Sequence, residues 1–288
     1  MSPATAIKPL KNHRHDTGWQ ASLSLTYAMA ENKTVLLKQA HRGPLFVQKS
    51  FYPEGPETCH TYIIHPPGGV VGGDTLTIAL GVNQDAHVVV TTPAAAKFYR
   101  STGHRAVQAN QIAVASGAVL EWLPQETIIY DQSDVQMTTK VELAGDAGFI
   151  GWEIICLGLP ACGRPFTRGS LVHRFEINRH QKPVYNESLR IYPGDPALDA
   201  AWGLAGRPVI GTMVATTEAP HAVEAIRKQM AHMPYEGYFT TTSLRQVVVS
   251  RFLGEDVYTG LTLFRQVWEI LRPLLTGKKP CPPRIWAT

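Results

Sequence analysis

The amino-acid sequence predicts a mainly β fold, and three observations support this class. Along residues 135–143, apolar and polar side chains alternate with a period of two, which is typical of a strand with one buried face. Other segments are apolar on both faces, as expected for strands covered on both sides. These are residues 62–64, 88–90, 149–157 and 246–249. Gly- and Pro-rich breakers separate the runs at close intervals, which indicates many strands joined by turns.

Two further segments show the same alternation. Residues 112–122 keep an even-numbered apolar face around Gly117. Leu171, His173, Phe175 and Ile177 share one face of another predicted strand. No repeat of fixed period is present, so the text of the sequence does not itself indicate a solenoid.

Two segments late in the chain follow helical spacing. Val223, Ile226 and Met230 follow Pro220 at intervals of three and four, and Pro is favoured in a first helical turn. A second, more apolar helix is predicted over residues 257–275, and we expect Pro273 to end or kink it. Both helices are expected to pack on a sheet. The alternative interpretation is that they form a partner-binding surface. For the second helix both interpretations apply if one side packs on the sheet and another side contacts the partner.

Composition limits the function classes. The 288 residues are 44% hydrophobic, and no long polar stretch divides them, so we expect a single domain over residues 18–288 after a flexible segment at 1–17. The net charge of +4 is spread out, without the basic, aromatic-rich stripe of a nucleic-acid binder. The four cysteines form no C-x-x-C pair, and no segment suits a signal peptide or a membrane span. These features predict a cytoplasmic protein.

The densest motif is the glycine-rich segment at 65–74. Its G-G-V-V-G-G-D spacing fits neither a dinucleotide-binding loop nor a Walker loop, so we interpret it as a tight corner. In this interpretation Asp74 is either a turn cap or a polar side chain that faces the interior of the molecule. The segment at 91–101 follows a strand, and Lys97 and Arg100 there either contact acidic groups or lie on a solvated loop.

No motif for a preformed metal site or a hydrolase is found. The chain has eleven histidines but no H-E-x-x-H, and it has no G-x-S-x-G elbow. Glu153 lies in an otherwise apolar strand, and Glu187 lies early in another. A carboxylate in such a position is paired, protonated or facing water. The two glutamates therefore either pair with arginines or line an internal hydrophilic passage for a cation.

The same segments resemble the UreD family of urease accessory proteins, called UreH in some organisms. The resemblance runs from Gly18 to the end of the chain. It rests on Gly18-Trp19-Gln20-Ala21, Phe51-Tyr52-Pro53-Glu54, Glu57-Thr58-Cys59-His60, His65-Pro66-Pro67-Gly68-Gly69 through Asp74, Thr92-Pro93, Lys97-Phe98-Tyr99-Arg100-Ser101, Leu120-Glu121-Trp122-Leu123-Pro124-Gln125, Cys156-Leu157-Gly158, Arg251-Phe252-Leu253, Trp268, Leu271-Arg272-Pro273, Gly277-Lys278 and Pro283-Arg284-Ile285-Trp286.

This resemblance implies stacked, β-helix-like sheets with two helices in the C-terminal half. It also implies a non-catalytic chaperone that binds UreF, UreG through UreF, and apo-urease, and it allows a dimer of such complexes. Ni²⁺ would be in transit, with no tightly bound cofactor. A water-filled passage would guide the nickel, and Asp74, Glu153 and Glu187 are our candidates for its lining. A weak nickel-binding or storage protein, or an enzyme with an unrecognised site, is the alternative.

Overall fold

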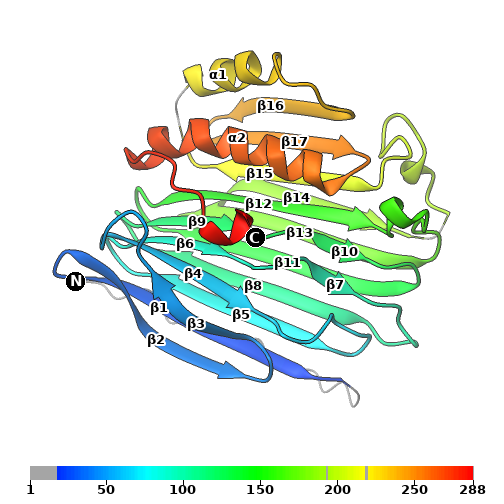
Figure 1. The fold of residues 1–288 in the computed structure, drawn as a ribbon, viewed down its shortest axis with the longest axis horizontal. Helices are drawn as coiled ribbons and strands as arrows, with labels where there is room; N and C mark the ends of the chain where they lie inside the picture. Colours follow the sequence, from blue (N-terminus) through cyan, green and yellow to red (C-terminus); the bar gives the residue numbers. More distant parts are fainter. Residues whose placement is uncertain (1–17, 193, 218–219, 288) are drawn as a thin grey trace.

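The computed structural model describes residues 18–192, 194–217 and 220–287, which form two β-sheets and two α-helices (Figure 1). The seven-stranded sheet contains, in spatial order, β14 (Lys182–Ile191), β13 (Gly169–Arg179), β11 (Ser133–Leu143), β8 (Ala106–Val114), β5 (Thr75–Val82), β1 (Gln20–Ala30) and β2 (Lys33–Arg42). The ten-stranded sheet contains β16 (Tyr238–Leu244), β17 (Val247–Gly254), β15 (Val209–Ala215), β12 (Gly148–Leu157), β9 (Val119–Leu123), β6 (His87–Thr91), β4 (Thr58–Ile64) and β3 (Phe46–Phe51), with β10 (Thr127–Ile129) and β7 (Ala96–Phe98) paired beside β12. The helices are α1 (Pro220–Met230) and α2 (Val257–Thr276), and short 3₁₀ turns span Pro160–Cys162, Pro196–Leu198 and Arg284–Ala287.

The chain winds between the two sheets. From β4 to β13, apart from the short β7 and β10, each strand lies in the opposite sheet to the strand before it. Neighbouring strands of the wound part are parallel within each sheet, and antiparallel pairs complete both ends. The colours of Figure 1 therefore run from blue at the bottom through cyan and green to yellow and orange at the top, and the red C-terminal end returns to the middle. The expected mainly β fold with β-helix-like stacking and two late helices is confirmed.

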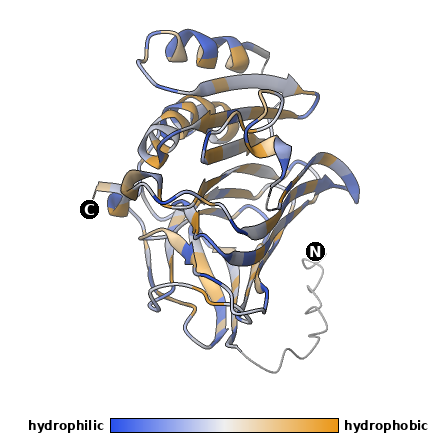
Figure 2. Cartoon of the chain, turned by 90° about the vertical axis from the view of Figure 1, so that its right-hand side faces the viewer, coloured by the Kyte–Doolittle hydropathy of each residue, from blue (hydrophilic) through white to orange (hydrophobic). Residues whose placement is uncertain are grey.

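Two apolar cores hold these layers together. The first lies between the sheets, and the second lies between the ten-stranded sheet and the helices. Side chains of β12 alternate between them, since Phe149 and Ile155 belong to the first core while Trp152 and Ile154 belong to the second. This is why the predicted strand at 149–157 is apolar on both faces. Figure 2 shows the hydrophobic residues gathered on the strands and on the helices above them.

The helices follow the predicted spacing with one difference. Asp256 Oδ1 caps the start of α2 by accepting a hydrogen bond from Thr259 N at 2.8 Å. One of the two expectations for Pro273 was that it ends the helix, and this is wrong, because α2 continues to Thr276. Pro273 lies in the last turn, where its missing N–H removes a single backbone bond. The helix stops instead at Gly277, whose φ of 68° is left-handed.

The glycine-rich segment forms the expected corner. Gly73 has a φ of 97°, which favours glycine. A Cβ on Gly72 would lie 2.7 Å from Ser101 Oγ, so this backbone approaches the next loop too closely for any side chain. The corner thus packs the segment at 68–74 directly on the segment at 97–101.

A buried ionic cluster fixes α2 on the ten-stranded sheet. Glu121 on β9 is fully buried and accepts hydrogen bonds from Trp268 Nε1 at 2.6 Å and from Arg272 Nε at 2.9 Å. His87 Nε2 lies 2.7 Å from the same carboxylate. Burial acts to raise the pKa of Glu121, but the bonds and charges of His87 and Arg272 outweigh it and lower that pKa. The carboxylate is therefore ionised and paired.

The guanidinium of Arg272 also reaches the first turns of the winding. Its Nη2 donates to both carboxylate oxygens of Glu54 at 2.7 Å. Despite the opposing effect of burial, His60 and Arg272 lower the pKa of Glu54 to about 2. One side chain of α2 thus joins two carboxylates from distant parts of the chain.

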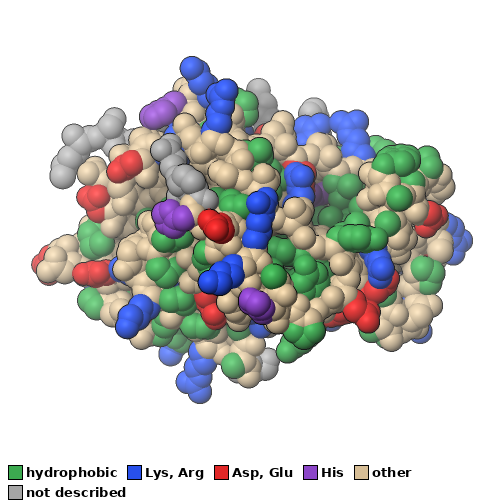
Figure 3. Space-filling model, turned by 90° about the horizontal axis from the view of Figure 1, so that it is seen from above, with side chains coloured by type: hydrophobic (Ala, Val, Ile, Leu, Met, Phe, Trp, Pro, Cys, Tyr) green, Lys and Arg blue, Asp and Glu red, His purple; other side chains and the backbone are tan. Residues whose placement is uncertain are grey.

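The outer surface is mixed in charge. Figure 3 looks onto the side where α1 and α2 lie, and basic, acidic and hydrophobic side chains are interspersed there. Within the described ranges, no helix combines the length and the apolar character needed to cross a bilayer.

We predict that Arg272→Met destabilises the fold by about 3–5 kcal/mol, because Glu121 is left buried without its cation. Urea denaturation followed by circular dichroism measures this loss. The control Arg284→Met, at an exposed position near the C-terminus, should change the free energy of unfolding by less than about 0.5 kcal/mol. A loss below about 1 kcal/mol for Arg272→Met would contradict the structural role of the cluster.

Candidate functional site

A line of polar side chains, here called the polar file, crosses the apolar space between the two sheets. It consists of Asn110, Thr139, Glu153, His173 and Glu187. Glu153 projects from β12 in the ten-stranded sheet, and the other four project from the neighbouring strands β8, β11, β13 and β14 of the opposite sheet. The winding therefore gathers residues from five strands in one line.

The inner part of the file is closed by hydrogen bonds. Asn110 Nδ2 donates to Thr139 Oγ1 at 2.8 Å. The Thr139 hydroxyl in turn donates to Oε1 of Glu153, and His173 Nε2 bonds to Oε2 of the same carboxylate. Both oxygens of Glu153 are thus bonded, but neither of them to a lysine or an arginine.

The outer part of the file reaches the surface at the edge strand β14. Glu187 accepts hydrogen bonds from the Tyr185 hydroxyl at 2.6 Å, from Thr212 Oγ1 at 3.0 Å and from Arg251 Nη2 at 2.9 Å. Thr212 is the register neighbour of Glu153 in the ten-stranded sheet, and its hydroxyl reaches Glu187 on the opposite sheet.

Exposure rises steadily along this line. The side chain of His173 is 3% exposed, that of Glu153 8%, that of Glu187 18% and that of Arg251 54%. Glu187 therefore stands between the buried part of the file and solvent.

The charge of His173 depends on the file. Burial acts to lower the pKa of this imidazole, but the hydrogen bond and charge of Glu153, together with the charge of Glu187, outweigh burial and raise it. Nδ1 of His173 is buried and has no hydrogen-bond partner within the part of the chain that the structure describes. The file thus contains one nitrogen atom that is free to accept or donate a further bond.

Two of the three predicted site residues belong to the file, and the third does not. Glu153 and Glu187 both act on His173, so the structure brings them together. Asp74 instead accepts hydrogen bonds from Trp19 N at 2.7 Å and from Val71 N at 3.0 Å, at the turn before β5. These contacts make Asp74 a turn cap, and its role in a nickel passage stays a prediction.

The sequence analysis did not single out Asn110, Thr139 or His173, although a signal was present. Thr139 and His173 occupy buried-face positions of otherwise apolar alternations, between Met137 and Val141 and between Leu171 and Phe175. A polar residue at such a position must find a partner in the interior. Among the described residues, no group of three His, Cys, Asp or Glu side chains is arranged to hold a metal ion.

The fold and the file define a mainly β scaffold with a hydrogen-bonded polar line through its core, and comparison with known proteins identifies its family. The family model described as UreD urease accessory protein matches residues 20–287. The urease accessory protein UreD 2 of Brucella anthropi is 43% identical over 273 residues, which cover 94% of this chain and 99% of that protein. The UreD proteins of Dechloromonas aromatica and Klebsiella pneumoniae subsp. pneumoniae are 40% and 39% identical, over 99% of this chain and 100% and 99% of their own lengths.

The chain therefore belongs to the UreD family of urease accessory proteins. Membership of this family means a role in urease maturation, and the resemblance noted in the sequence is confirmed.

We predict that the pKa of His173 falls when Glu153 loses its charge. In the wild type this pKa should lie above about 6.5. In the Glu153→Gln variant the carboxylate that raises the pKa is gone, so burial of the imidazole should bring the pKa below that value. A titration of the histidine resonances by NMR measures both values. The resonances of the exposed His104, which lies outside the polar file, serve as the internal reference.

The raised pKa of His173 determines how the free energy of unfolding of the wild type depends on pH. The interaction between protonated His173 and Glu153 stabilises the fold. Its contribution is fully present below about pH 6.5 and is lost as the pH rises through the folded-state pKa of His173. A His173→Gln variant should lack this loss. If its free energy of unfolding had the same pH dependence as that of the wild type, the proposed charge pair would be absent.

Proposed function

We propose that this protein is a non-catalytic chaperone that binds apo-urease together with UreF, and UreG through UreF, and guides Ni²⁺ toward the urease active site. Family membership supports the role in urease maturation. The observation that carries the nickel part of the proposal is the polar file, in which Glu153 and Glu187 form a graded route from the interior to the surface.

The chemistry of the file suits a cation in transit. Carboxylate and hydroxyl oxygens attract a divalent cation and exclude anions, since a line of negative groups favours cation entry. Nickel binds strongly to many nitrogen and oxygen ligands, so a route that must release it needs sites with few ligands. Glu153 offers two oxygens and His173 offers one unbonded nitrogen, which is fewer donors than a storage site supplies.

Entry of a cation requires the file to open. The bonds from Thr139 and His173 to Glu153 close the inner part, and a protonated His173 repels a metal ion. Loss of the His173 proton removes this repulsion, and the incoming Ni²⁺ then supplies the positive charge beside Glu153, with one unit more than the proton it replaces. We therefore propose that nickel exchanges with this proton as it passes Glu153, and that no cofactor is held permanently.

The proposal includes a cytoplasmic location, where the partners would be met, and it allows two accessory complexes to pair. The accessory-protein names of its relatives support a role that is not enzymatic. Nickel storage is the competing proposal, and tight, stoichiometric binding of Ni²⁺ in an isothermal titration of the isolated chain would favour it.

We predict that Glu153→Gln and Glu187→Gln each lower the nickel content of urease several-fold while the accessory complex still assembles. Glutamine keeps the shape of the side chain but removes the charge that attracts the cation. Urease is co-expressed with its accessory proteins and each variant, and nickel per urease is measured by inductively coupled plasma mass spectrometry.

A matched control is Glu176→Gln, because Glu176 lies on β13 but on the face away from the file. It should leave nickel loading unchanged. Loss of the complex in Glu153→Gln would make the effect structural, and normal nickel loading in both file variants would overturn the route.

A further inference from the structure

A groove of about 380 Å³ lies on the surface away from the polar file. We call it the arginine groove, and it is lined by Tyr99, Arg100, Tyr130, Asp131, Leu159 and Arg164. The loop at 97–101 supplies Tyr99 and Arg100, and the loops that follow β10 and β12 supply the other four residues.

The backbone around Arg100 is held on both sides. Tyr99 N donates to Val70 O at 2.9 Å, and Ser101 N donates to Gln132 O at 2.8 Å. The Tyr99 hydroxyl donates to Gly68 O at 2.9 Å, and a Cβ on Gly69 would lie 2.4 Å from the ring of Tyr99. The glycines therefore leave room for the Tyr99 ring, and the corner fixes the position from which Arg100 extends.

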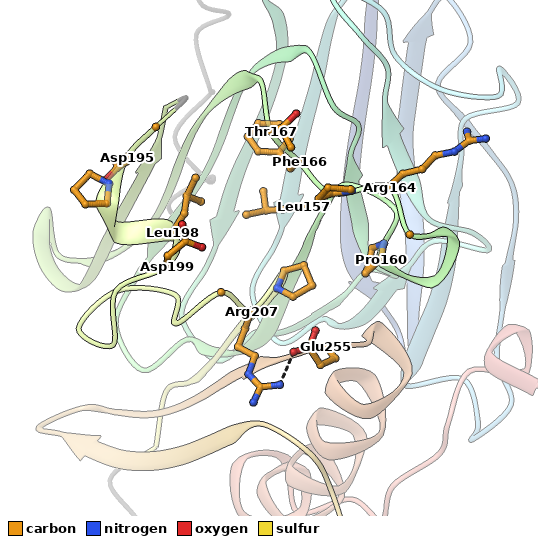
Figure 4. A pocket seen from close by; sticks show the side chains of 16 residues that line it. Leu157, Pro160, Arg164, Phe166, Thr167, Asp195, Leu198, Asp199, Arg207 and Glu255 are labelled. Carbon is orange, nitrogen blue, oxygen red and sulfur yellow. Dashed lines mark hydrogen bonds and ion pairs between the residues drawn. The ribbon is translucent and has the colours of Figure 1, made fainter.

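The second arginine is also fixed at its backbone. Leu159 N donates to Arg164 O at 2.7 Å, and Arg164 N donates back to Leu159 O at 3.1 Å. Figure 4 shows the Arg164 side chain pointing away from a neighbouring cavity of about 630 Å³, in which Arg207 is already paired with Glu255. Arg164 therefore borders both hollows, with its side chain pointing away from the larger one.

Both guanidinium groups lack a counter-ion of their own. Arg100 and Arg164 are exposed, and neither makes an ion pair or a side-chain hydrogen bond within the described ranges. The carboxylate in the groove is already occupied, since Asp131 Oδ1 accepts from Thr167 N at 2.8 Å and from Arg168 N at 2.7 Å. Between them, the rings of Tyr99 and Tyr130 meet edge to face with centroids 4.8 Å apart. Two free positive groups therefore flank an aromatic floor.

We propose that the arginine groove docks an extended, acidic segment of a partner protein in urease maturation. Guanidinium groups bind carboxylates through paired hydrogen bonds, and Arg and Tyr side chains are enriched among residues that dominate binding energy. Fixed backbones reduce the entropy lost on binding. A polyphosphate backbone fits less well, because the negative charge of Asp131 and the aromatic floor oppose closely spaced phosphates. The partner's identity rests on the proposed function, whereas the chemistry of the groove does not.

A peptide-binding experiment tests the chemistry with the full-length protein. The probe is a fluorescein-labelled hexapeptide of alternating Glu and Leu, compared with the same peptide carrying Gln in place of Glu. Fluorescence anisotropy should show about tenfold tighter binding of the acidic peptide at low salt, from two exposed charge pairs, with the difference falling as salt rises. Arg100→Gln/Arg164→Gln should abolish this difference.

The matched control is Arg174→Gln/Arg190→Gln, which removes two exposed arginines from the seven-stranded sheet and should keep the difference. Thermal unfolding checks that both double variants remain folded. An unchanged preference in the groove variant would overturn the proposal. Displacement of the peptide by millimolar inorganic phosphate would also overturn it, by making the groove a site for free anions.

Co-purification from cells that express urease and its accessory proteins tests the partner. Arg100→Glu/Arg164→Glu should lose one of these proteins, while Arg174→Glu/Arg190→Glu and Glu153→Gln retain all of them. If Glu153→Gln leaves nickel loading normal while the groove variant still loses a partner, the nickel route fails and the docking site stands. If the groove variant retains every partner, this assignment of the groove is wrong even where the nickel route holds.

Discussion

The winding of the chain between two sheets is the constraint on which the rest of the molecule depends. Because each turn contributes one strand to each sheet, every inward side chain of the wound part enters the same interior. Asn110 and Thr139 are 29 residues apart in sequence but directly paired in register, and the next turn adds His173 on β13. A polar residue at one inward position is costly unless neighbouring turns supply partners, so the polar file is a property of several turns together.

The two buried glutamates of the ten-stranded sheet have partners of different kinds, a permanent cation for Glu121 and a titratable imidazole for Glu153. Glu121 is bonded to the permanent cation Arg272 and to Trp268, and a metal ion would have to displace an arginine to reach it. Glu153 is bonded to a hydroxyl and to an imidazole, which can lose its proton. Breaking the first set leaves Glu121 buried without its cation, whereas exchanging the His173 proton for a metal ion still leaves a positive charge beside Glu153. The structure therefore separates a carboxylate that locks α2 in place from one that can change its partner.

Much of the local structure was predictable, whereas the pairing of distant residues was not. The alternation at 135–143 and the two-faced apolar run at 149–157 appear as β11 and β12, and the spacing after Pro220 appears as α1. These patterns depend on near neighbours in the chain. The partner of Glu153 lies 20 residues away in the opposite sheet, and Arg272 lies 218 residues from Glu54. Such pairs depend on how many residues each turn of the winding contains, which no local pattern records. The same limit explains Asp74, whose turn-capping role required only neighbours, while its distance from the file depended on the whole fold.

The positions of the polar file and the arginine groove have a consequence for how the protein works. The file reaches solvent beside β14 and β17, whereas the groove is formed by loops at the ends of β7, β10 and β12. The contacts described link neither Arg100 nor Arg164 to any residue of the file. Sites that share no partners affect free energies independently. Under the function proposed above, docking of a partner at the groove and passage of a cation along the file would therefore change separately, and the partners would stay bound while the ion moves on.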